Sequence, residues 1–146
     1  MIVADTGPLV AAADRHDRAH RLASTLVLGA GRELLVPDAV AAETDWLIRR
    51  RVGHPAARAF LEALTDGLPR RVTLQEAVFA RAAAIDRHHA DLGLGLVDAS
   101  VMALAEAERA PILTFDFEHF RAAPAPGGDP WELLVDEARY LRAVRR

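Results

Sequence analysis

Four acidic side chains stand at places in the sequence where carboxylates could do chemistry. Asp5 and Asp116 each follow a short apolar stretch that is typical of a buried strand. Asp98 follows an apolar segment at the start of a helical pattern, and Glu43 interrupts the apolar stripe of another predicted helix. Because ligands collect at the carboxyl ends of the strands in an open α/β sheet, we expect these four acids to converge on one site.

Converging carboxylates repel one another, so such a site needs a cation. Two unit charges about 4 Å apart cost on the order of 4 kcal/mol at an effective dielectric constant near 20. The chain contains no Cys, which excludes a disulfide scaffold and zinc sites built on thiolates. Oxygen ligands alone select hard cations. The sequence therefore predicts that a hard cation such as Mg²⁺ or Mn²⁺ binds where these carboxylates converge.

Each acid also has a structural interpretation when it is taken alone. Asp5 could serve only as the N-cap of a helix that begins near Pro8, and Asp98 could cap a later helix in the same way. Asp116 could form a turn, and Glu43 could lie at the exposed margin of its helix. The occurrence of all four acids in one chain favours a site.

The elements that must position the acids alternate along the chain. Strand patterns occur at residues 2–4, 34–36, 71–73, 112–115 and 131–135. Helical patterns occur at residues 9–14, 19–28, 38–52, 56–64, 74–90 and 137–145, and from Asp98 to Pro111. Asp38 is the expected N-cap of the helix over 38–52, and residues 122–130 are expected to form a loop. This alternation predicts an α/β fold, a central mostly parallel sheet of about four to five strands with helices on both faces.

Length and composition limit the class of protein. The 146 residues predict a single domain over 1–146, with about 136–146 as a C-terminal tail helix. No apolar run approaches 18 residues and no signal peptide is visible, so we expect a cytoplasmic protein without a membrane segment. The net charge of −3 gives no overall nucleic-acid signature. Arg49, Arg50 and Arg51 form a cluster that could pair with phosphate oxygens, and a solvated helix face is the alternative.

Four stretches of the sequence follow a shared pattern. They are Ile-Val-Ala-Asp5-Thr6-Gly-Pro-Leu-Val-Ala, the helical Glu43, Leu-Gly-Leu-Val-Asp98-Ala-Ser100 and Ile-Leu-Thr114-Phe-Asp116-x-x-His-Phe. In this order and at these separations they resemble the PIN-domain ribonucleases, and more narrowly the VapC toxins of bacterial toxin–antitoxin pairs. The resemblance extends from Met1 to about Val135.

The resemblance implies a PIN-like fold and a toxin endoribonuclease that hydrolyses RNA phosphodiester bonds with Mg²⁺ or Mn²⁺. It implies that the acidic quartet of Asp5, Glu43, Asp98 and Asp116 is catalytic. Asp5, Asp98 and Asp116 would then hold Mg²⁺ (or Mn²⁺), with Glu43 binding directly or through water. It also implies an RNA substrate (tRNA or rRNA), a homodimer, and a VapB-type antitoxin that neutralises the enzyme. We expect the antitoxin to contact the helices over 38–52 and 56–64, near Trp46.

Several further residues have secondary roles in this interpretation. Thr6, Thr114 and Ser100 match positions whose hydroxyls support the carboxylates, and the cluster Arg49–Arg51 would contact RNA. Glu118 stands where some members have a fifth acid, so it is an additional candidate metal ligand. The residues after Asp116 indicate a fixed local structure with Phe120 as its core anchor.

Two other functions fit parts of the sequence. Asp5-Thr6-Gly7 is also the tripeptide of aspartic proteases, but their mechanism needs two such aspartates and a β-rich fold, whereas this chain has one and is mostly helical. The second alternative is a PIN-like module that binds RNA or a partner without cutting. A nuclease assay with and without divalent ions separates that module from an enzyme.

Overall fold

The computed structural model describes residues 1–145, with a four-stranded parallel sheet at the centre; Arg146, the end of the predicted tail, lies outside the described residues. The strands are β1 (Ile2–Ala4), β2 (Leu34–Pro37), β3 (Arg70–Val72) and β4 (Ile112–Leu113), in the spatial order β3-β2-β1-β4. Val3 on β1 pairs with Leu35 on one side and Ile112 on the other. The sheet therefore places the residues that follow β1 and β4 side by side at its carboxyl edge.

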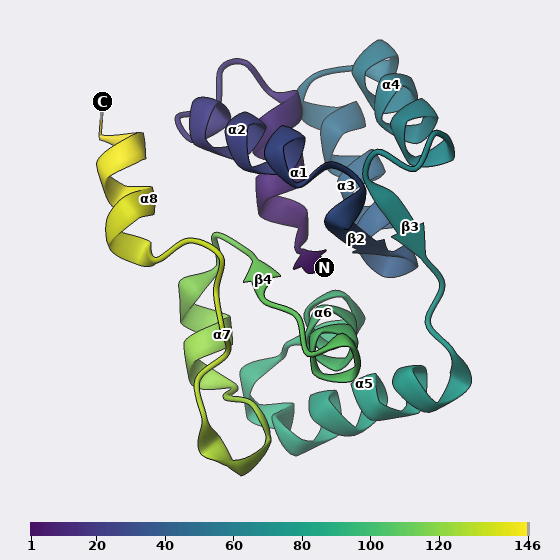
Figure 1. Ribbon diagram of the computed structural model, residues 1–146, viewed down its shortest axis with the longest axis vertical. Coiled ribbons are helices and arrows are strands. Elements are labelled where there is room, and N and C mark those ends of the chain that lie inside the picture. Colours follow the sequence, from purple (N-terminus) through teal and green to yellow (C-terminus); the bar gives the residue numbers. More distant parts are fainter. Residues whose placement is uncertain (146) are drawn as a thin grey trace.

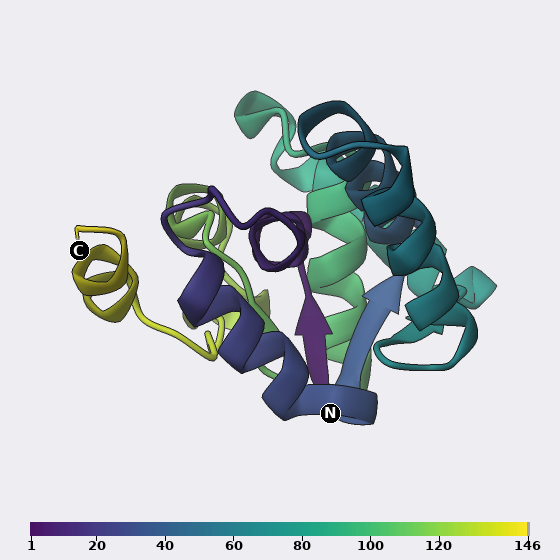
Figure 2. The same ribbon diagram turned by 90° about the horizontal axis from the view of Figure 1, so that it is seen from above.

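Eight α-helices within residues 1–145 surround this sheet. They are α1 (Thr6–Ala13), α2 (His20–Ala30), α3 (Asp38–Arg51), α4 (His54–Thr65), α5 (Glu76–His88), α6 (Gly95–Glu108), α7 (Phe117–Ala122) and α8 (Glu137–Val144). α1, α2 and α4 lie on one side of the sheet and α5 and α6 on the other (Figure 1). α6 runs alongside β1 and β2 and contacts both (Figure 2). The predicted α/β architecture with helices on both faces is confirmed.

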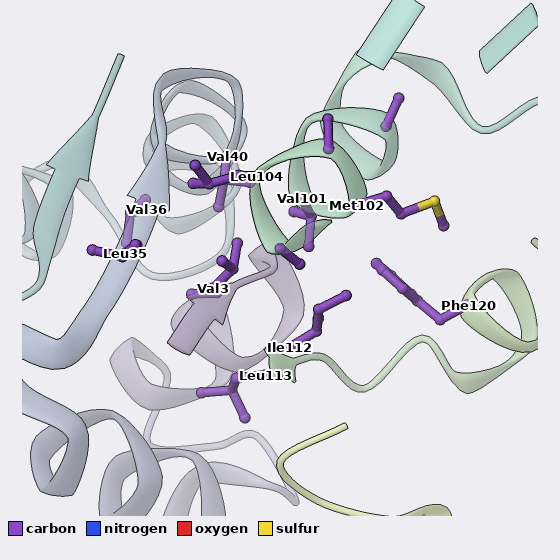
Figure 3. Packing of buried hydrophobic residues seen from close by; sticks show 14 of the residues in the cluster. Val3, Leu35, Val36, Val40, Val101, Met102, Leu104, Ile112, Leu113 and Phe120 are labelled. Carbon is purple, nitrogen blue, oxygen red and sulfur yellow. The ribbon is translucent and has the colours of Figure 1, made fainter. Parts of the chain in front are cut away.

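The core lies between the sheet and α6. Val3 and Ile112 from the strands face Val101 and Met102 of α6, and the ring of Phe120 from α7 points toward Met102 (Figure 3). Every residue of α6 from Ala99 to Ala105 is buried, so this helix is enclosed on all sides. Each large apolar side chain buried in this way contributes roughly 1.5–3 kcal/mol to stability. This packing fixes α6, which carries Asp98, and α7, which follows Asp116.

The predicted fifth strand is reduced to a single bridge. Leu133 pairs in parallel with Ile112, the amide of Ile112 donates to the carbonyl of Glu132, and the amide of Leu134 donates to the carbonyl of Ile112. Trp131 lies outside this bridge, and its indole N–H donates to the carbonyl of Ala123 at 2.7 Å. The apolar pattern over 131–135 therefore identifies a buried edge of the sheet but overestimates its length.

Two predicted helix starts were wrong. Asp38 is the first residue of α3, and Pro37 occupies the N-cap without a side-chain hydrogen bond. The carboxylate of Asp38 instead accepts hydrogen bonds from Arg71 at 2.7 Å and Thr73 at 2.6 Å. α6 begins at Gly95, so Asp98 lies inside its first turn and does not cap it. Neither Asp38 nor Asp98 therefore caps a helix, and each carboxylate binds side chains that are distant in the sequence.

The tail packs on the body of the protein through Tyr140 and Val144, and Glu137 forms an ion pair with Arg121. Tyr140 of α8 lies with its ring 4.7 Å from that of Phe115 and 5.6 Å from that of Phe117. α8 also contacts α2. Within residues 1–145 there is no helix with the length and apolar character needed to span a membrane.

Candidate functional site

An open pocket of about 710 Å³ lies where the carboxyl ends of β1 and β4 meet α3 and α6. This volume is within the range of ligand-binding sites. Arg51 of α3 and His119 of α7 are part of its lining. So are all four acids predicted from the sequence, which are Asp5, Glu43, Asp98 and Asp116. The structure therefore brings together residues that are more than 110 positions apart in the chain.

Asp5 lies on the buried side of the pocket and is only 5% exposed. It is the N-cap of α1, and its Oδ1 accepts a hydrogen bond from the amide of Thr6 at 2.8 Å. Its Oδ2 accepts a second one from the hydroxyl of Thr114 at 2.7 Å. The capping and site interpretations of Asp5 are therefore compatible, because one carboxylate begins the helix and also lines the pocket.

Two threonine hydroxyls connect the acids. The hydroxyl of Thr6 donates to Oε2 of Glu43 at 2.7 Å, which ties α1 to α3. The hydroxyl of Thr114 donates to Asp5 and accepts a hydrogen bond from the amide of Asp116 at 2.9 Å. Each hydroxyl thus limits the directions that a carboxylate can take. This is the geometry that a supporting role for Thr6 and Thr114 requires.

His119 lies between the two remaining acids. Its Nδ1 is 2.9 Å from Oδ2 of Asp98 and 3.0 Å from Oδ2 of Asp116. Asp116 is the N-cap of α7, and its Oδ1 accepts a hydrogen bond from the amide of His119 at 3.1 Å. The same histidine is therefore held to Asp116 by both its backbone and its ring.

The charges in the pocket shift the protonation of its members. Burial raises the pKa of Asp5 above its usual value, although hydrogen bonds from Thr114 and Thr6 partly oppose this effect. Burial, and then the charge of Asp5, raise the pKa of Asp98 to about 6. Burial lowers the pKa of His119, but the charges of Asp116 and Asp98 outweigh burial and raise it. The pocket therefore holds more negative charge from its carboxylates than its basic side chains neutralise.

Some predicted site residues lie outside this pocket. Ser100 is buried and lines a neighbouring pocket with Asp38 and Thr73. Glu118 is exposed and is not among the residues that line the pocket of the four acids. Both residues therefore lie outside the lining of the pocket, and their supporting and metal-binding roles stay predictions.

The three clustered arginines have different surroundings. Arg49 forms an ion pair with Asp45 at 2.6 Å, and the guanidinium of Arg50 lies 4.8 Å from the ring centre of Trp46. Arg51 lines the acidic pocket and forms no ion pair within the described part of the chain. Only Arg51 of the three therefore faces the site.

His119 is the site residue to which the sequence assigned no chemistry. Its signal was present, because a side chain three positions after Asp116 shares a helix face with it. The pattern around Phe120 favoured a structural interpretation of the segment, and Phe120 is indeed only 2% exposed. The neighbouring histidine points the other way, into the pocket.

The donor set fits a divalent cation. Potential ligand atoms of Asp98, Asp116 and His119 all lie within 4.8 Å of one another. Asp5 and Glu43 add carboxylates around the same pocket. Carboxylate oxygens suit Mg²⁺ and Mn²⁺, and the uncompensated negative charge favours a cation.

Comparisons with known proteins identify the family of this chain. A family profile described as PIN domain matches residues 2–125, which include all four acids. Ribonuclease VapC26 of Mycobacterium tuberculosis (strain ATCC 25618 / H37Rv) is 33% identical over 134 residues, which cover 91% of this chain and 99% of that protein. The crystal structure of Mycobacterium tuberculosis VapC20, described as a sarcin–ricin loop cleaving toxin, has a TM-score of 0.73 at 24% identity and covers 81% of this chain and 92% of that one. The chain therefore belongs to the PIN-domain family and, within it, to the VapC ribonucleases.

Proposed function

We propose that this protein is a metal-dependent endoribonuclease that acts as the toxin of a toxin–antitoxin pair. The observation that carries the proposal is the convergence of Asp5, Glu43, Asp98 and Asp116 on one open pocket. Asp5 and Asp116 also cap helices, but capping does not require four carboxylates in one place, and their mutual repulsion destabilises the fold. They suit the binding of a cation and, through it, of a phosphodiester.

Asp98 and Asp116 would hold Mg²⁺ or Mn²⁺ together with Asp5, which Thr6 and Thr114 keep in place. When bound, the ion lowers the pKa of a water molecule and neutralises charge on the phosphate. Oε2 of Glu43 accepts a hydrogen bond from Thr6, which leaves its Oε1 to orient the attacking water. The water oxygen attacks phosphorus and the bond to the 3′ oxygen breaks. The products are a 5′-phosphate and, after proton transfer, a 3′-hydroxyl.

The two alternative functions make different demands on the site. An aspartic protease needs a second aspartate sharing a proton with Asp5 in a β-rich fold, and the sheet here is a parallel one covered by helices. An RNA-binding module without catalysis has no need of four acids around its pocket. The nuclease has.

Asp116→Asn and Asp136→Asn form a matched pair that tests the proposal. Both aspartates are N-caps that accept a hydrogen bond from the amide three positions later, Asp116 on α7 and Asp136 on the exposed start of α8. Asparagine caps helices as well as aspartate does, so both variants should fold. We expect Asp116→Asn to lose cleavage by at least 100-fold, on the scale of losing one transition-state contact, and Asp136→Asn to keep it. Equal activity of both variants in Mg²⁺ or Mn²⁺ would contradict the proposal, as would full wild-type activity in excess chelator.

RNA with unpaired nucleotides is the expected substrate, because single strands expose both backbone and bases. A tRNA panel and a hairpin of the sarcin–ricin loop are the first substrates to test. The second choice follows from the description of the VapC20 structure, which shares the fold with this chain. An RNA of either kind would be met in the cytoplasm. Mapping the 5′ ends of cleaved RNA identifies the substrate and the cut bond.

The partner of this chain would be a VapB-type antitoxin with an apolar segment. An apolar groove of about 340 Å³ lies between α1, α2 and α4, and Leu28 and Phe60 are among its walls. Leu28 is 80% exposed, which is unusual for leucine unless something covers it. This groove supports a location on α4 as expected, but neither Trp46 nor any other residue of α3 is part of its lining.

We also propose a homodimer. Phe79 of α5 and Leu96 of α6 are 50% and 48% exposed and line one apolar pocket of about 390 Å³. Leu96 is also part of the lining of the acidic pocket, so a second copy on this surface would lie beside the site. Light scattering on the purified protein tests the assembly, and Phe79→Glu should convert a dimer into a monomer if this surface is used.

A further inference from the structure

We propose that His119 is a nitrogen ligand of the divalent cation, completing a mixed oxygen–nitrogen site with Asp98 and Asp116. The inference rests on the proposed function, because it concerns the same ion. It goes further in assigning a ligand that is not a carboxylate. It also predicts which metal the protein prefers.

The first argument is the spacing of the ligand atoms. Nδ1 of His119 lies 2.9 Å from Oδ2 of Asp98 and 3.0 Å from Oδ2 of Asp116. In an octahedral site with bonds of about 2.1 Å, neighbouring ligand atoms lie about 3.0 Å apart. Nδ1 of His119 therefore already lies at the separation of an adjacent ligand from each of the two carboxylates, and the ligand atoms of all three side chains lie within 4.8 Å of one another. Within residues 1–145 this is the one group of three or more His, Asp or Glu side chains whose potential ligand atoms all lie within 4.8 Å of one another.

The second argument is that the ring is held in position from behind. The amide of His119 donates to Oδ1 of Asp116, which fixes the first turn of α7. The next residue, Phe120, is buried against Met102 and anchors the same turn in the core (Figure 3). A ligand on such a turn loses little conformational freedom when it binds. The imidazole is nevertheless 38% exposed, so its Nε2 can reach water, which metal-bound histidines often use as their outer partner.

The third argument is that Asp5 is less available than the sequence suggested. Its two oxygens already accept hydrogen bonds from Thr6 and Thr114, and the residue is 5% exposed. Asp5 therefore reaches the pocket from its buried side with part of its acceptor capacity in use. His119 lies on the solvent-exposed side of the pocket, from which an ion would enter.

A nitrogen ligand changes the preference for metals. Carboxylates and water suit Mg²⁺ and Mn²⁺ alike, whereas imidazole favours transition ions over Mg²⁺. We therefore expect the wild-type protein to bind Mn²⁺ more tightly than Mg²⁺. His119→Gln should weaken Mn²⁺ binding by at least about tenfold, the lower limit for losing even an outer-shell partner of a metal site. Mg²⁺ binding should change less, so the ratio of the two affinities falls.

The experiment is pulsed electron paramagnetic resonance of Mn²⁺ bound to full-length protein carrying ¹⁵N-labelled histidine. Binding of Mn²⁺ and Mg²⁺ is measured on the same samples by calorimetry. His119→Gln is compared with His16→Gln, which makes the same change at an exposed histidine outside the pocket. We expect a ¹⁵N coupling in the wild type and in His16→Gln, and none in His119→Gln.

Four outcomes would overturn the inference. Mn²⁺ bound without ¹⁵N coupling in the wild type would leave an oxygen-only site, with the proposed nuclease intact. Coupling that survives in His119→Gln would assign the nitrogen to another histidine. Tighter metal binding by His119→Gln would make His119 a competing counter-ion of Asp98 and Asp116 in place of a ligand. Absence of Mn²⁺ binding by every variant and the wild type would also reject the metal-dependent function itself.

Discussion

Asp98→Asn should raise the melting temperature of the metal-free protein at pH 7.5, although it removes a residue of the proposed site. Burial and the charge of Asp5 raise the pKa of Asp98 from 3.8 to about 6, and His119 offsets only part of this. At pH 7.5 the folded protein therefore holds an ionised carboxylate in an unfavourable place. Asparagine keeps the shape of the side chain and an oxygen that can accept from His119, but it carries no charge.

The size of the effect follows from the pKa. The difference between 3.8 and about 6 corresponds to about 3 kcal/mol, at 1.36 kcal/mol for each pKa unit. Solvent in the open pocket screens part of this cost, and the place of Asp98 in the first turn of α6 returns up to ~1 kcal/mol through the helix dipole. We therefore expect a net gain of about 1–2 kcal/mol for Asp98→Asn. In a chain of this size that is about 3–6 °C.

The effect should depend on pH in a defined direction. Because the folded pKa of Asp98 lies above the unfolded one, the folded state binds more protons between the two values. The stability of the wild type therefore falls as pH rises from about 4 to about 6. The advantage of the variant should be complete above about pH 7, smaller at pH 5, and absent below about pH 4.

Thermal unfolding followed by circular dichroism measures these differences, with chelator and with millimolar Mg²⁺ or Mn²⁺. A cation that binds only the folded wild type adds about 2.7 kcal/mol at a hundredfold excess over Kd, and Asp98→Asn should gain less. Asp38→Asn is the control of opposite sign. Burial raises the pKa of Asp38, but hydrogen bonds from Thr73 and Arg71 and the charge of Arg71 lower it overall, so its loss should destabilise. The reasoning fails if Asp98→Asn melts below the wild type in chelator at pH 7.5.

Three further predictions concern single contacts. Thr114→Val removes the hydroxyl that donates to Asp5 and accepts from the amide of Asp116. It should therefore lower the free energy of unfolding in urea by about 1–3 kcal/mol and reduce RNA cleavage. Thr114→Ser keeps the hydroxyl and should retain both stability and cleavage. Arg51→Ala should weaken RNA binding when it is made in a protein inactivated by Asp116→Asn, and the slope of log K against log salt concentration should fall in magnitude by about 1. An equal loss of binding in Arg50→Ala would show that the arginines act only through their charge and not through their positions. Ala59→Glu places a charge in the apolar groove and should abolish antitoxin binding, measured by calorimetry, without changing RNA cleavage. Ala80→Glu, at an exposed position of α5, is the control. Equal antitoxin binding by the two variants would exclude the groove as the antitoxin site.

Local patterns predicted most of the elements because each depends on neighbouring residues. Strands β1, β2 and β4 begin at the predicted residues, and every predicted helix exists within residues 1–145 with ends shifted by a few positions. The pattern failed where a partner elsewhere in the chain decides the structure. The last predicted strand pairs with β4 only between Leu133 and Ile112, and Asp38 binds Arg71 and Thr73 in place of capping α3.

The sequence by itself determined the fold class, the family and the four acids of the candidate site. These follow from residue type, periodicity and order, which need no knowledge of distances. The tertiary structure alone decided which side chains support the acids, because the partners are far apart in the chain. Thr114 holds Asp5 across 109 positions, and Thr6 holds Glu43 across 37.

The same limit explains His119 and the arginines. A histidine three residues after Asp116 is common in helices and carries no meaning until Asp98 is known to lie on its other side, 21 positions away in the chain. Arg49, Arg50 and Arg51 are equivalent in sequence but point in different directions around α3, so one pairs with Asp45, one stacks on Trp46 and one faces the pocket. Residue type fixes what a side chain can do, whereas packing determines what it meets.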